Sequence, residues 1–87
     1  MIPKMAHPIL ITGGTANEIL ICLKRLSDFE LSKEQEYICL RVLYNLTRFA
    51  TLPDFINGCG NRSKMGITRK QMEVIEPFVE NVSEFVW

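Results

Sequence analysis

The chain has 87 residues, of which 47% are hydrophobic and 23% charged, and its ten basic and ten acidic side chains give a formal net charge of zero. A chain of this length forms one modest core without room for a separate catalytic lobe, and zero net charge argues against a whole-surface attraction to nucleic acid or anionic lipid. No apolar run approaches the roughly 20 residues of a membrane span, so we expect a soluble, cytoplasmic protein.

Residues 1–14 are expected to form an extended arm, whose structure the sequence leaves open. The apolar run Ile9-Leu10-Ile11 suits a short strand, an arm across the core, or an arm donated to another subunit. Gly13-Gly14-Thr15 follows it, but the three spaced glycines of the dinucleotide-binding fingerprint are absent. We interpret this segment as a flexible turn before a helix. An anion or nucleotide held by the backbone amides of residues 13–15 is a weaker alternative.

Three segments match the S/T-x-x-E/Q capping box, in which the N-cap hydroxyl accepts from the N3 amide and the N3 side chain accepts from the N-cap amide. They are Thr15-Ala16-Asn17-Glu18, Ser32-Lys33-Glu34-Gln35 and Thr68-Arg69-Lys70-Gln71. Apolar residues recur at helical spacing after each of them. The sequence therefore predicts helices over about 16–28, 33–50 and 69–84.

The central predicted helix, 33–50, has only one narrow polar stripe. Glu34, Arg41, Asn45 and Arg48 fall within an arc of roughly 60°, and apolar residues cover most of the remaining girth. Such a helix must be buried on several sides, and any flank left bare becomes a partner surface. Arg41 and Arg48 either form its solvent edge or bind a carboxylate or phosphate of a partner.

Proline and glycine interrupt the chain after this helix. Pro53 to Asn57 is predicted to be a single helical turn closed by Gly58, and 58–66 a loop. The loop would leave the Cys59 thiol accessible, whereas Cys22 and Cys39 lie in apolar helical contexts and are expected in the core. Three cysteines without a CxxC pair favour reduced thiols. With one histidine in the chain, we expect neither a metal site nor a cofactor.

Charged side chains cluster at two places near the C-terminus. Arg62, Lys64, Arg69 and Lys70 form a basic loop, 62–70, which either contacts nucleic acid or is simply solvated. Glu73, Glu76, Glu80 and Glu84 share an arc of roughly 80° on the last helix, opposite its apolar seam. Like charges at this spacing repel, so they form either an acidic docking strip for a basic partner or an ordinary solvated face.

Together these patterns predict an all-α domain over 1–87, a bundle of three main helices plus one short helical turn with an extended N-terminal arm. No catalytic constellation is visible, so we do not expect an enzyme. The leading hypothesis is a non-enzymatic adaptor or inhibitor that binds another protein with a basic surface and forms a homo-oligomer. A small nucleic-acid-binding regulatory protein is the alternative.

Overall fold

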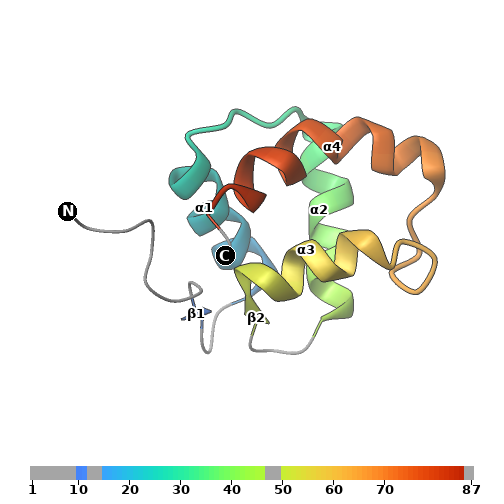
Figure 1. The fold of residues 1–87 in the computed structure, drawn as a ribbon, viewed down its shortest axis with the longest axis horizontal. Coiled ribbons are helices and arrows are strands. Elements are labelled where there is room, and N and C mark those ends of the chain that lie inside the picture. The colour runs from blue at the N-terminus through green and yellow to red at the C-terminus, as the bar shows by residue number, and fades with distance from the viewer. Residues whose placement is uncertain (1–9, 12–14, 47–49, 86–87) are drawn as a thin grey trace.

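The computed structural model describes residues 10–11, 15–46 and 50–85. These residues form four helices: α1 (Ala16–Ser27), α2 (Lys33–Asn45), α3 (Leu52–Gly60) and α4 (Arg69–Ser83). Two-residue strands, β1 (Leu10–Ile11) and β2 (Ala50–Thr51), pair antiparallel with Leu10 opposite Thr51. The helices pack around one another in a compact arrangement (Figure 1), which confirms the predicted all-α class. No helix among the described residues is long and apolar enough to cross a membrane.

All three predicted capping boxes are present, and each fixes the start of a helix. The Thr15, Ser32 and Thr68 hydroxyls accept from the N3 amides at 3.1 to 3.2 Å, and the N3 side chains accept in return from the N-cap amides. These contacts satisfy amides that have no partner within the helix. The predicted starts of α1, α2 and α4 are therefore confirmed.

Removal of one capping hydroxyl should weaken the protein without changing its fold. We expect Ser32→Ala and Thr68→Ala each to lower the free energy of unfolding by about 1 kcal/mol, because one first-turn amide loses its acceptor. Urea denaturation followed by circular dichroism measures this loss. Ser63→Ala is a matched control, since Ser63 is exposed and caps no helix. Unfolding curves for both cap variants that coincide with the wild type would contradict these helix boundaries.

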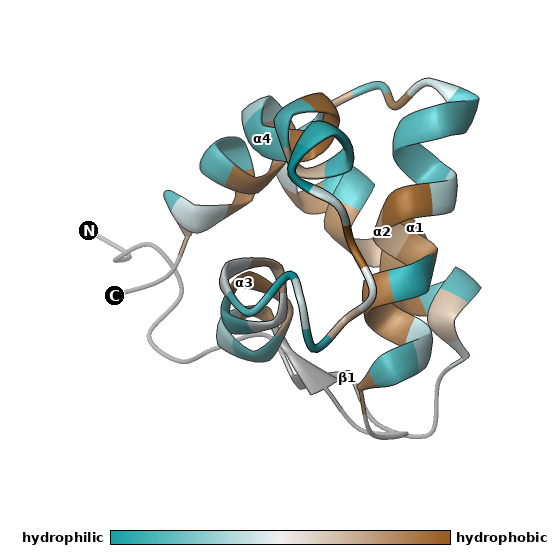
Figure 2. Ribbon diagram, turned by 90° about the vertical axis from the view of Figure 1, so that its right-hand side faces the viewer, coloured by the Kyte–Doolittle hydropathy of each residue, from teal (hydrophilic) through white to brown (hydrophobic). Residues whose placement is uncertain are grey.

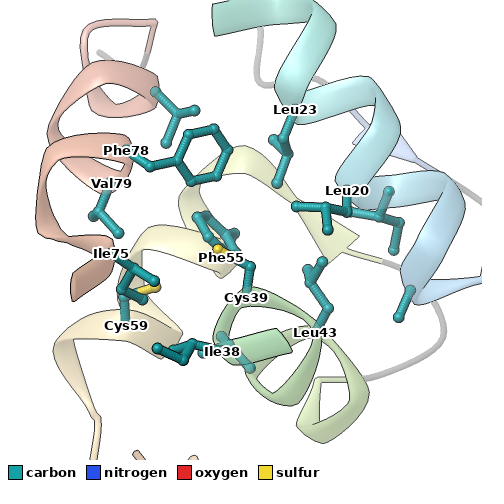
Figure 3. Close-up of a cluster of buried hydrophobic side chains, with 14 of the residues drawn as sticks. Leu20, Leu23, Ile38, Cys39, Leu43, Phe55, Cys59, Ile75, Phe78 and Val79 are labelled. Atoms are coloured by element: carbon teal, nitrogen blue, oxygen red, sulfur yellow. The ribbon is translucent and has the colours of Figure 1, made fainter. Parts of the chain in front are cut away.

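The core lies where the four helices meet. Phe55 and Phe78 are its largest side chains, both fully buried, and their ring centroids are 6.1 Å apart in an edge-on arrangement. Ile38 and Cys39 come from α2, Leu20 and Leu23 from α1, and Ile75 from α4 (Figure 3). Hydropathy follows the same plan, since the apolar sides of the helices face inward (Figure 2). All four helices therefore contribute to a single core.

The central helix is shorter than its sequence pattern predicts. α2 ends at Asn45 and not at Ala50, because Leu46 takes an extended conformation with φ −86° and ψ 170°. The Asn45 side chain donates to the Arg41 carbonyl at 2.8 Å and to the Met65 carbonyl at 3.3 Å, so it ties the last turn to a neighbouring loop. Ala50 belongs to β2. Leu46 and Ala50 matched the helical period, but Leu46 caps α2 and Ala50 lies in a strand, and Phe49 lies outside the described residues.

The segment after β2 is a nine-residue helix, so the prediction of one short turn was wrong. α3 runs through Gly58, which lies against α2: a Cβ atom there would be 3.0 Å from Cγ1 of Val42. Glycine serves here for close helix packing and not as a helix end. Leu52, Phe55 and Cys59 form the buried side of α3.

Two of the three cysteine predictions were wrong, and they were wrong in opposite directions. Cys59 is buried within α3, whereas Cys22 is exposed on α1. Cys22 lies about 110° around the helix from the centre of the arc formed by Ala16, Ile19, Leu20 and Leu23, which places it outside the packed face. Cys39 is buried, as predicted.

α4 is continuous from Arg69 to Ser83, although Pro77 lies within it. A proline removes the amide that would bond the carbonyl four residues earlier, here that of Glu73. The next carbonyl, of Val74, accepts from Nε2 of Gln35 at 3.0 Å. This contact joins the first turn of α2 to the middle of α4.

Candidate functional site

The four glutamates of the predicted acidic strip are all exposed: Glu73, Glu76 and Glu80 on α4, and Glu84 at its C-cap. The opposite side of the helix carries Ile75, Phe78, Val79 and Val82, which are buried. Pro77 is exposed between the glutamates, since it lies within about 40° of Glu73 around the helix. The acidic strip therefore also presents one apolar ring to solvent.

Three of these carboxylates have no partner within the part of the chain that the structure describes. Glu73, Glu76 and Glu80 make no ion pair or hydrogen bond with another described residue through their side chains. By contrast, Glu36 on α2 pairs with Lys24 of α1 at 2.6 Å. These three carboxylates thus contribute charge to the surface without cross-linking the described part of the fold.

A second surface feature, which the sequence pattern did not single out, is an aromatic face on α2. Tyr37 and Tyr44 are 57% and 66% exposed, although both belong to the helix that the sequence predicts to be buried over most of its girth. Arg41 lies between them on the same side of the helix, and its guanidinium carbon is 5.9 Å from the centre of the Tyr37 ring. Exposed tyrosine with arginine is the composition of many binding hot spots.

The loop of residues 61–66 lies against this aromatic face. Gly66 has φ +71°, a conformation that favours glycine, and a Cβ atom there would be 2.9 Å from Nη2 of Arg41. The loop that carries the exposed cations Arg62 and Lys64 therefore lies beside α2 at Arg41 and Asn45. We name Tyr37, Arg41, Tyr44, Arg62 and Lys64 together the tyrosine–arginine face.

The structure separates the predicted basic cluster into two parts. Arg62 and Lys64 belong to the tyrosine–arginine face, whereas Lys70 lines an open depression of about 430 Å³ with Glu34, Gln71, Glu73 and Val74. Two carboxylates, Glu34 and Glu73, line the same depression as Lys70 and offset part of its positive potential. Arg69 is exposed at the start of α4. Arg48 lies outside the described residues.

The proposed anion site at residues 13–15 is described only at Thr15. The Thr15 amide donates to Oε1 of Glu18 at 3.2 Å, so the capping box already uses it. The Glu18 carboxylate also places a negative charge at this helix start, where it disfavours a bound anion. Gly13 and Gly14 lie outside the described residues.

The buried thiols are chemically quiet. Burial raises the pKa of Cys59 to about 12, and burial, with smaller contributions from Cys59 and Glu36, raises the pKa of Cys39 to about 12. A nucleophilic thiol needs a lowered pKa and access to solvent, and neither residue has them. Within the described ranges, no group of three or more histidine, cysteine or acidic side chains is placed to hold a metal ion.

Comparison with family models, with curated proteins and with solved structures found no match to this chain. The acidic strip and the tyrosine–arginine face are consequently interpreted from their own chemistry.

Proposed function

We propose that this protein is a non-enzymatic interaction module, an adaptor or inhibitor that acts by binding a protein with a basic surface. The observation that carries the proposal is the acidic strip, because three of its exposed carboxylates have no partner among the described residues. Unpaired like charges on one helix face repel by a few tenths of a kcal/mol per pair. A basic partner would relieve that repulsion on contact.

The tyrosine–arginine face supports the same proposal. Two tyrosines more than half exposed are unusual for a helix whose other side forms the core, and tyrosine and arginine together supply contact area and hydrogen bonds at protein interfaces. An oligomer is part of the proposal, because this face exposes two large aromatic side chains, Tyr37 and Tyr44. The other apolar sides of α2, which suggested an oligomer in the sequence, are covered because α1, α3 and α4 all pack against this helix.

Substitution of Glu76 and Glu80 by glutamine should slow binding without harming the fold. We expect an association rate about tenfold lower at low salt, because opposite charges steer encounter, and a melting temperature equal to or slightly above that of the wild type. Stopped-flow or biosensor kinetics with the partner captured from the source cell measure the rate, and the difference should shrink as salt rises.

Asp28→Asn with Glu30→Gln is the matched control, since it also removes two exposed carboxylates but lies off the strip. Asparagine tolerates the left-handed conformation of Asp28, whose φ is 52°. The control should bind at the wild-type rate. Equal association rates for the strip variant and the wild type at low salt would show that the strip is only a solvated face. A melting temperature of the strip variant several degrees below the wild type would show that the strip is a structural ion-pair network.

A nucleic-acid-binding regulatory protein is the second candidate, because residues 55–72 contain four basic side chains and no acidic one. Exposed tyrosines beside cations also suit stacking of unpaired bases. Nucleic-acid binding would give the acidic strip no role, and the carboxylates of the strip would repel a polyanion. We therefore rank it below protein binding.

A further inference from the structure

We infer that the basic partner of the acidic strip is a second copy of this chain, whose tyrosine–arginine face docks on the strip so that molecules join head to tail. The inference rests on the proposed function and names the partner of the same site. Residues 37–72 hold six basic side chains and one acidic one, Asp54, whereas 73–85 hold four acidic side chains and no basic one.

The two surfaces match in kind as well as in charge. The tyrosine–arginine face presents Tyr37 and Tyr44 among cations, and the acidic strip presents Pro77 among carboxylates. Tyrosine packs on a proline ring while its neighbouring guanidinium and ammonium groups bond carboxylates. The two surfaces are formed by different elements, so one molecule can bind a second copy through its strip and a third copy through its tyrosine–arginine face at the same time.

The lengths of the two surfaces also agree. At a rise of 1.5 Å per residue, Glu73 to Glu84 extends over about 16 Å, and Tyr37 to Tyr44 over about 10 Å. The strip is therefore long enough to cover the aromatic pair and to extend beyond it.

A symmetric dimer through either surface is the competing arrangement, and charge argues against it. A two-fold axis through either surface would place that surface on its own copy, and for the tyrosine–arginine face this would bring Arg41, Arg62 and Lys64 against the same three cations. The strip would likewise meet four carboxylates of its partner. Like charges across an interface are disfavoured, whereas the head-to-tail arrangement pairs opposite charges at every contact.

Charge reversal tests this pairing directly. One variant carries Glu76→Lys and Glu80→Lys, and another carries Arg62→Glu and Lys64→Glu. All four side chains are exposed. Circular dichroism melts serve to check that both variants fold. In size-exclusion chromatography with light scattering at low salt, each variant alone should elute as a 10.0 kDa monomer. An equimolar mixture should recover masses of at least twice that value. Arg25→Glu with Lys33→Glu, an equal charge change at exposed sites elsewhere, should associate like the wild type.

The charge variants can overturn the inference in two ways. A mixture that stays monomeric while both variants are folded means that the two surfaces do not meet. Should either pair of reversals unfold the protein, Glu76→Gln with Glu80→Gln and Arg62→Gln with Lys64→Gln replace them, and wild-type association in both contradicts the pairing.

The same samples separate this inference from the proposed function. A monomeric wild type that binds a captured protein only when the strip is intact refutes self-association and leaves the proposed function standing. A monomeric wild type without strip-dependent binding removes both. Salt-sensitive retention of the monomer on a single-stranded oligonucleotide, lost in the Arg62→Glu and Lys64→Glu variant, also overturns the inference, because it assigns the face to nucleic acid.

Discussion

Replacement of Phe78 by alanine should leave the protein largely unfolded at 25 °C. Phe78 is fully buried on α4, and its ring centroid lies 5.4 Å from that of Phe29 and 6.1 Å from that of Phe55. Truncation of a buried phenylalanine costs about 3–5 kcal/mol through lost transfer energy and the cavity left behind. A domain of this size has only a few kcal/mol of stability in total.

The control for Phe78→Ala is Ile21→Ala, which removes a large apolar side chain from an exposed position outside both proposed surfaces. It should change the free energy of unfolding by no more than about 0.5 kcal/mol. Urea denaturation followed by far-ultraviolet circular dichroism measures both. A loss below about 1 kcal/mol for Phe78→Ala would mean that α4 does not pack against α3 as described.

The second large effect concerns the cysteines: one thiol should react quickly with a disulfide reagent, and two should react only after unfolding. Cys22 is exposed, whereas Cys39 and Cys59 are buried and their pKa values are raised to about 12. A rise in pKa from 9.0 to about 12 lowers the fraction of thiolate at neutral pH about a thousandfold. Burial also blocks the reagent from reaching these thiols. Spectrophotometric thiol titration in buffer and in urea counts the two classes, and Cys22→Ser should abolish the fast one. Three equally fast thiols would contradict the burial of α3.

The same pKa values predict how stability depends on pH. In the unfolded chain the thiols have a pKa near 9.0, and in the folded protein near 12. The folded state therefore holds more protons than the unfolded state above pH 9, and stability falls as pH rises between about 9 and 12. Below pH 9 the thiols are protonated in both states and contribute no slope. The double variant Cys39→Ala with Cys59→Ala should show a shallower decline than the wild type.

Local chemistry explains which parts of the fold the sequence predicts. The capping boxes at Thr15, Ser32 and Thr68 involve contacts only three residues apart, so the starts of α1, α2 and α4 follow from the sequence alone. The end of α2 and the length of α3 depend instead on contacts distant in sequence. Asn45 reaches Met65, and Gly58 packs on Val42. No local pattern distinguishes a glycine that ends a helix from one that lets two helices approach.

One of the two candidate surfaces could likewise be predicted from the sequence, and the other could not. The acidic strip follows from helical periodicity, and its exposure on α4 agrees with that pattern. The tyrosine–arginine face does not, because Tyr37 and Tyr44 look like core residues in an apolar helix, and only the packing of α1, α3 and α4 decides which side of α2 stays open. The one usable signal was Arg41, which lies between the two tyrosines at helical spacing.

Sedimentation velocity on the wild-type chain, over a range of micromolar concentrations at low and at high salt, tests most directly whether the protein works by charge-driven association. We expect a weight-average mass of at least twice 10.0 kDa at low salt that rises with concentration, and a return toward the monomer at high salt, because screening weakens contacts between opposite charges. A single 10.0 kDa species at every concentration and at both salt levels would contradict it.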